Sequence, residues 1–100
     1  MAEEDPVYGL IHRLFTHPGQ REAFIGLVRD HGAPPGCLSL VLAHDPAHPD
    51  GVWITEVWPS EDAYRAALAR EDVQATVTAT RGLVASFDAP ATTRPVVVLP

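Results

Sequence analysis

Residues 52–68 read VWITEVWPSEDAYRAAL, and along this stretch the hydrophobic pattern changes from alternation to helical spacing. The alternation predicts a strand over residues 52–58. Pro59 ends that strand because proline cannot donate to a sheet ladder, and Ser60 is a favourable N-cap. The sequence therefore predicts a helix that begins near Glu61, directly after the strand.

The residues before this stretch predict two more strands and another helix. Residues 7–15 alternate as a strand does, and both of their faces are largely apolar. Apolar residues at helical spacing predict a helix at residues 20–31, after which residues 37–43 alternate again. Residues 44–51 are dense in turn formers, so we expect a long-looped hairpin between the strands at 37–43 and 52–58.

The residues after this stretch complete the pattern of elements. A second helical stretch is predicted from Glu71 until Gly82, then a linker at residues 89–95 and a last short strand at residues 96–99. The order strand, helix, strand, strand, helix pair, strand is the split β-α-β plan of a ferredoxin-like fold. The expected fold class is α+β, with an antiparallel sheet that carries its helices on one face.

Length and composition narrow the class of protein. One hundred residues suit one domain, expected over residues 7–100 after a disordered acidic tail at residues 1–6. A formal charge of -6 disfavours nucleic acid and anionic membranes as partners. The chain has neither a signal-peptide pattern nor a membrane-spanning run, which indicates a cytoplasmic location. Cys37 is the only cysteine, as expected in a reducing compartment, and we interpret it as buried and inert.

One face of the predicted sheet is apolar although no helix is expected to cover it. In water it would form a patch larger than monomers usually tolerate. We therefore predict a two-fold homodimer, sheet against sheet. The residues expected on this face are Val7, Ile11, Val41, Ala43, Trp53 and Val57.

Taken in order, several motifs resemble the antibiotic-biosynthesis-monooxygenase (ABM) family of the dimeric α+β barrel superfamily. The first strand runs into Phe15-Thr-His-Pro-Gly19, the following helix carries Phe24, and Pro35-Gly-Cys-Leu38 opens the second strand. Thr55-Glu-Val-Trp58 followed by Ser60-Glu-Asp-Ala-Tyr-Arg65 is similar to the Glu-x-Trp and helix-start motif of that family. The resemblance covers nearly the whole chain and implies a half-barrel that closes into a dimeric α/β barrel.

The resemblance also implies a site between the sheet and the helices. Oxygenases of this family bury an aromatic substrate there and let its deprotonated form pass an electron to molecular oxygen, without a metal or flavin cofactor. The candidate catalytic residues are then His12, Glu56 and Trp58. The candidate substrate-binding residues are Tyr64, Leu10, Leu14, Ile54 and Leu68.

Each candidate also has a structural interpretation. His12 lies among leucines on the helix-facing side, where burial would favour the neutral ring that a general base needs, but a hydrogen-bonded core histidine fits the same position. Glu56 either orients such a base or forms a structural ion pair with Arg13 or Arg81. Trp58 and Tyr64 are either pocket walls or core aromatics.

Three polar residues of the family pattern are missing from this sequence. The quinol-type and haem-degrading branches often carry a histidine on the helix nine or ten positions after the Trp, where Ala67 and Leu68 stand here, which argues against haem degradation. The anthrone-oxidising branch tends to have an asparagine four before the Trp and an arginine on the last helix, where Ile54 and Thr78 stand. Trp58 and Tyr64 match that branch, whereas its polar partners are missing.

The hairpin loop gathers four polar residues of metal-ligating types. Two histidines at this spacing bind a metal well on a helix, but Pro46 and Pro49 exclude a helix here. We therefore predict a solvated turn and no metal. The residues in question are His44, Asp45, His48 and Asp50.

The sequence leaves three functions open. The first is a cofactor-independent monooxygenase that acts on a polycyclic aromatic or quinol-like small molecule. The second is a non-catalytic binding or stabilising module of the same fold, which the missing family residues would explain. The third is an isomerase or lyase of the dimeric barrel class that uses His12 as a base without oxygen.

Overall fold

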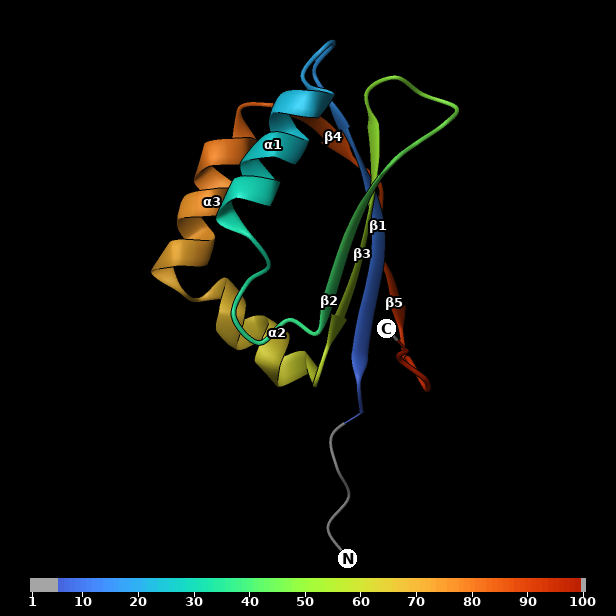
Figure 1. Cartoon of the computed structure of the whole chain (residues 1–100), viewed down its shortest axis with the longest axis vertical. Coiled ribbons are helices and arrows are strands. Elements are labelled where there is room, and N and C mark those ends of the chain that lie inside the picture. Colours follow the sequence, from blue (N-terminus) through green and yellow to red (C-terminus); the bar gives the residue numbers. More distant parts are fainter. Residues whose placement is uncertain (1–5, 100) are drawn as a thin grey trace, which may run out of the picture.

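The computed structural model describes residues 6–99, which form one antiparallel sheet with helices packed on one of its faces (Figure 1). This confirms the predicted α+β class and the ferredoxin-like order of elements through residue 81. The elements are β1 (Tyr8–Thr16), α1 (Arg21–His31), β2 (Ser39–His44), β3 (Gly51–Trp58), α2 (Glu61–Leu68), α3 (Glu71–Arg81), β4 (Val84–Phe87) and β5 (Ala91–Thr93). Of the predicted tail at residues 1–6, residues 1–5 lie outside the described residues.

The central strands pair as the sequence pattern indicates. The strand order is β2-β3-β1-β4, and β2 and β3 form the predicted hairpin. In the β1–β3 register His12 lies opposite Ile54, and Leu10 lies opposite Glu56. Because β1 and β3 are antiparallel neighbours, the helix-facing residues of both strands share one surface.

The end of the chain differs from the prediction. No strand forms at residues 96–99. Instead, β4 pairs with the carboxyl half of β1, and β5, which lies inside the predicted linker, pairs with its amino half. Gly9 allows the close approach of β5, since a Cβ there would collide with the Thr93 hydroxyl. The edge of β1 is therefore already paired before the chain reaches Val96, which is 91% exposed.

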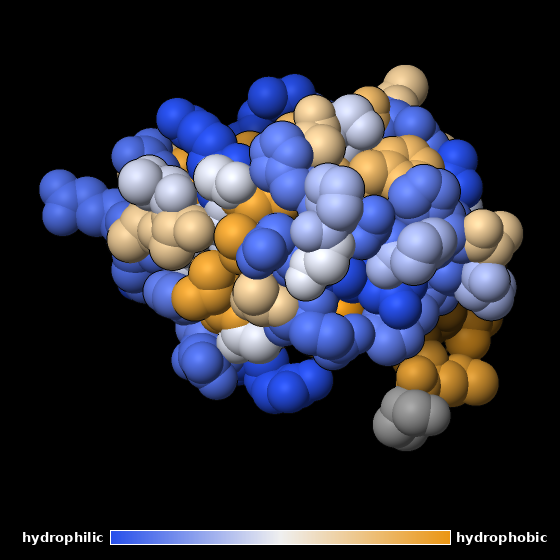
Figure 2. Space-filling view, turned by 90° about the horizontal axis from the view of Figure 1, so that it is seen from above, coloured by the Kyte–Doolittle hydropathy of each residue, from blue (hydrophilic) through white to orange (hydrophobic). Residues whose placement is uncertain are grey.

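Side-chain burial confirms the predicted faces of the sheet. Leu14, Val52 and Ile54 are buried on the helix side and pack in one core cluster with Phe24 of α1. On the opposite face Trp53 is 37% exposed. Apolar side chains also reach the surface elsewhere, as the view from above shows, where hydrophobic patches interrupt a mostly hydrophilic surface (Figure 2).

The helices begin and end where the sequence indicates. The Ser60 hydroxyl accepts the backbone N–H of Ala63 at 3.1 Å, so Ser60 is the N-cap predicted for α2. Gly32 ends α1 with a φ of 77°, a left-handed conformation that favours glycine. No helix within residues 6–99 combines the length and apolar character needed to cross a bilayer.

The loop between β2 and β3 is more ordered than a solvated turn. Asp45 is buried, accepts the backbone N–H of Ala47 at 2.9 Å, and pairs with Arg13 at 3.1 Å. These bonds lower the pKa of Asp45, chiefly through the Ala47 N–H. The prediction was wrong at Asp45 because its hydrogen-bond partner Arg13 lies on β1, far away in sequence.

Candidate functional site

A cavity of about 270 Å³ lies between the sheet and the helices α1 and α3. This volume is just below the range of about 300–1,000 Å³ typical of small-molecule sites, so the cavity suits a compact ligand. Its walls are mainly aliphatic, with polar groups at a few places. The aliphatic lining includes Val28, Leu40, Leu42, Ile54, Val73 and Val77.

The sheet side of the cavity carries a histidine–carboxylate pair. His12 and Glu56 lie diagonally across the β1–β3 ladder, and Nε2 of His12 is 2.8 Å from Oε2 of Glu56. The two side chains are 24% and 14% exposed. Because a carboxylate only accepts hydrogen bonds, His12 donates from Nε2, and in the neutral ring the lone pair is then on Nδ1. Within residues 6–99 that nitrogen has no hydrogen-bond partner.

Trp58 holds the other oxygen of the same carboxylate. Its indole N–H donates to Oε1 of Glu56 at 3.1 Å, so both carboxylate oxygens have a donor. Since a ring held through one nitrogen keeps its tautomer and orientation, the arrangement Trp58–Glu56–His12 positions the imidazole. The predicted Glu56 bridges to Arg13 or Arg81 do not form; Arg13 pairs with Asp45 and Asp88.

Behind Glu56 the aromatic rings pack in series. Trp58 is 1% exposed and meets Tyr64 edge to face with ring centroids 5.6 Å apart, and Tyr64 lies 5.4 Å from Tyr8. Burial raises the pKa of the Tyr64 phenol, and the charge of Glu56 raises it further. Tyr64 therefore remains protonated at neutral pH and cannot act as the proton acceptor.

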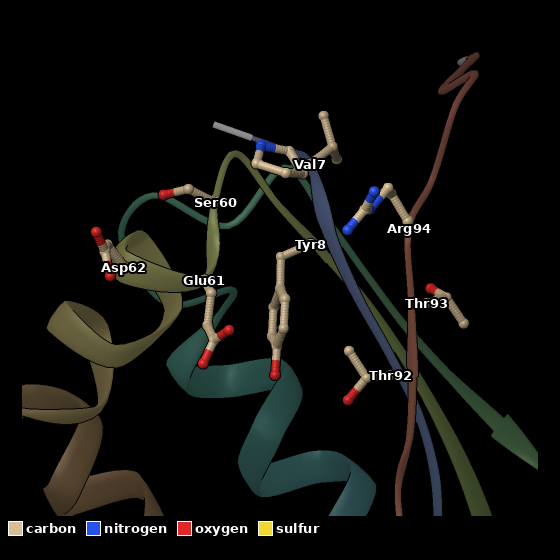
Figure 3. Close-up of a pocket in the computed structure, with 9 residues that line it drawn as sticks. Val7, Tyr8, Ser60, Glu61, Asp62, Thr92, Thr93 and Arg94 are labelled. Carbon is tan, nitrogen blue, oxygen red and sulfur yellow. The ribbon is translucent and has the colours of Figure 1, made fainter. Parts of the chain in front are cut away.

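A second hollow of about 390 Å³ lies on the far side of this aromatic row. Figure 3 shows the Tyr8 ring between Glu61 at the start of α2 and Thr92 on β5. The Glu61 carboxylate is already paired with Arg65 at 2.6 Å. This hollow is lined mostly by hydroxyl and charged groups, so it lacks the apolar walls that an aromatic substrate needs.

The structure divides the predicted site residues into two groups. His12, Glu56, Ile54 and Leu68 line the cavity together. The other four lie outside its lining, and three of them, Leu10, Leu14 and Trp58, are buried. Leu14 belongs to the core cluster with Phe24, which closes the space at that end of β1. The four outside the lining are Leu10, Leu14, Trp58 and Tyr64.

Apart from Leu68, the sequence analysis missed the helical side of the cavity. His31, a basic residue in the last turn of α1, lines it and was not among the predicted site residues. Its place seven residues after Phe24 on the inner stripe was the available signal. From α3, Thr76 and Thr80 also line the cavity, and their hydroxyls donate to backbone carbonyls of the same helix.

The remaining chemistry-bearing residues do not assemble a further centre. Cys37 is partly buried, not fully buried as predicted, and this partial burial raises the pKa of its thiol, which keeps it protonated and poorly nucleophilic. Among residues 6–99 no three or more histidine, cysteine or acidic side chains gather as a metal site would require. The candidate site is therefore the cavity with its histidine–carboxylate pair.

A single antiparallel sheet with helices on one face, and a mainly apolar cavity with a histidine–carboxylate pair between the two layers, place the chain in the ferredoxin-like α+β class. Residues 7–79 match the family described as antibiotic biosynthesis monooxygenase, and the chain belongs to this family. The match spans both central strands and all of α1 and α2. No curated protein matches the chain.

Solved structures agree with this assignment. A protein of Chloroflexus aurantiacus, provisionally assigned as an antibiotic biosynthesis monooxygenase, is 41% identical with a TM-score of 0.87, covering 94% of this chain and 97% of its own. SnoaB, a cofactor-independent oxygenase from Streptomyces nogalater, is 21% identical with a TM-score of 0.72, and the match covers 95% of this chain and 98% of SnoaB. PA3566 from Pseudomonas aeruginosa is 19% identical with a TM-score of 0.73, and the match covers 96% of this chain and 100% of PA3566. The last two show likeness of fold alone.

Proposed function

We propose that the chain is a cofactor-independent monooxygenase that oxidises a small aromatic or quinol-like molecule with molecular oxygen. The observation that carries the proposal is the pair of His12 and Glu56 in a mainly aliphatic cavity. Family membership supports it, and SnoaB, a cofactor-independent oxygenase, is an example of a protein of this fold with such an activity.

The residues present suit the first step of such a reaction. Nδ1 of His12 accepts a proton from the substrate, and Glu56, held by Trp58, stabilises the imidazolium that forms. The aliphatic walls exclude water from the resulting anion, which then transfers an electron to oxygen. One oxygen atom enters the substrate and the other leaves as water, with the substrate supplying the electrons.

Oxygen uptake by the purified protein tests the proposal. A panel of anthrones and quinols is incubated anaerobically and then exposed to oxygen, and uptake is compared with product formation. We expect one oxygen molecule consumed per product for at least one compound. Binding of these compounds without uptake would overturn the proposal in favour of a binding module, and product formed without oxygen would indicate an isomerase or lyase.

We further propose that two chains pair through the uncovered sheet face to form the dimeric barrel. Ile11 is 39% exposed and Val41 51% exposed on this face. Arg13 lies there between two aromatic rings, 4.8 Å from the Trp53 centroid and 4.9 Å from that of Phe15. Arginine and tryptophan are the residues that most often dominate interface energies.

Sedimentation at micromolar concentration measures the pairing. We expect the mass of two chains for the wild type and of one chain for Ile11→Lys, because a lysine on the apolar paired face would be buried with an unpaired charge. Ala75→Lys on the exposed side of α3 is the control and should leave the mass unchanged. A folded wild-type monomer at this concentration would refute the pairing.

A further inference from the structure

The cavity has a second polar group opposite the sheet, at the end of α1. Nδ1 of His31 lies 2.8 Å from the carbonyl oxygen of Leu27. Because a carbonyl only accepts, His31 donates from Nδ1, and its Nε2 is left over for another partner. Within residues 6–99 Nε2 makes no hydrogen bond. The two cavity histidines thus keep opposite ring nitrogens without a partner in residues 6–99, Nδ1 of His12 and Nε2 of His31.

The other polar side chains of the helical wall already have partners within the protein. The Thr76 hydroxyl donates to the carbonyl of Asp72 at 3.3 Å, and the Thr80 hydroxyl donates to that of Thr76 at 3.0 Å. The Asp72 carboxylate pairs with Arg70 and accepts the backbone N–H of Val73 at 2.9 Å. His31 is therefore the side chain of this wall with an uncommitted ring nitrogen.

We infer that His31 is a specificity-determining residue that hydrogen-bonds the outer end of the ligand. The inference rests on the proposed function and narrows its substrate class. A ligand in this cavity would have one hydroxyl toward His12, a compact aromatic body against the aliphatic walls, and a second oxygen function toward His31. His31 is exposed at the cavity mouth, so it orients the ligand while the less exposed His12 removes the proton.

Anaerobic binding of two probes separates the two ends of the ligand. The probes are 1-naphthol, with one hydroxyl, and 1,5-dihydroxynaphthalene, with hydroxyls at opposite ends. For the wild type we expect the dihydroxy probe to bind about three- to tenfold more tightly, the effect of one hydrogen bond. His31→Leu should abolish that preference and leave 1-naphthol affinity within about twofold. His31→Gln should restore part of the preference, because its amide can bond in the same place.

His17→Leu is the matched control, because His17 is an exposed histidine outside the cavity lining. This variant should keep the preference for the dihydroxy probe. Equal preference in the wild type and His31→Leu would overturn the inference, and so would a wild type that binds neither probe. The two proposals can fail separately. If the preference for the dihydroxy probe depends on His31 but the protein consumes no oxygen, this inference is upheld and the proposed monooxygenase activity is refuted.

Discussion

The His12→Gln variant is expected to lose about 10²–10⁴-fold in kcat while it keeps its fold, the range typical of a removed general base. Gln places an amide where the ring nitrogen bonds Glu56, so the 2.8 Å contact can be replaced by a hydrogen bond of similar reach. An amide, however, cannot take a proton at neutral pH. Rates are measured with the best substrate of the oxygen-uptake panel, and folding by circular dichroism.

His44→Gln supplies the matched control, because His44 lies outside the cavity lining and pairs with the exposed Glu22. Its kcat should stay within about twofold of the wild type. Glu56→Gln adds a second comparison, since it removes the charge behind His12 but can retain a hydrogen bond to it. Wild-type turnover by His12→Gln would show that His12 is only a packed, hydrogen-bonded residue and that the proton acceptor lies elsewhere.

The Trp58→Ala variant is expected to lower the free energy of unfolding by about 3–5 kcal/mol, the usual cost of truncating a buried aromatic. Trp58 is almost fully buried, packs against Tyr64, and donates to Glu56. Alanine leaves a cavity and removes one of the two donors to this carboxylate. Urea denaturation of the variant and the wild type measures the difference.

Phe87→Ala is the matched control, because Phe87 is an aromatic strand residue that is 68% exposed. This substitution should change the free energy of unfolding by no more than about 0.5 kcal/mol. The loss of unfolding free energy in Trp58→Phe should fall between those of Trp58→Ala and Phe87→Ala, since phenylalanine keeps an aromatic ring but lacks the N–H donor. Unchanged stability of Trp58→Ala together with weakened ligand binding would contradict this interpretation and would make Trp58 a wall of the ligand pocket.

The sequence alone determined the features that depend on local pattern. Alternation along residues 7–15 and 52–58 predicted both central strands and the faces of their side chains, because the period of a strand is two residues. Pro59 and Ser60 predicted the start of α2 for equally local reasons. The juxtaposition of His12 and Glu56 followed from those faces once the two strands were expected to share a sheet.

Tertiary structure decided the features that depend on which distant segments meet. Val96 to Leu99 have strong strand propensity, yet β4 and β5 pair with β1 first, and propensity does not specify a partner. Tertiary packing also decided which residues line the cavity. Leu14 faces the helices as predicted but packs against Phe24 in the core cluster. His31 lines the cavity because α1 ends at the cavity wall. A periodic pattern tells which face of an element is buried, but the space left between two elements depends on how their side chains fill it.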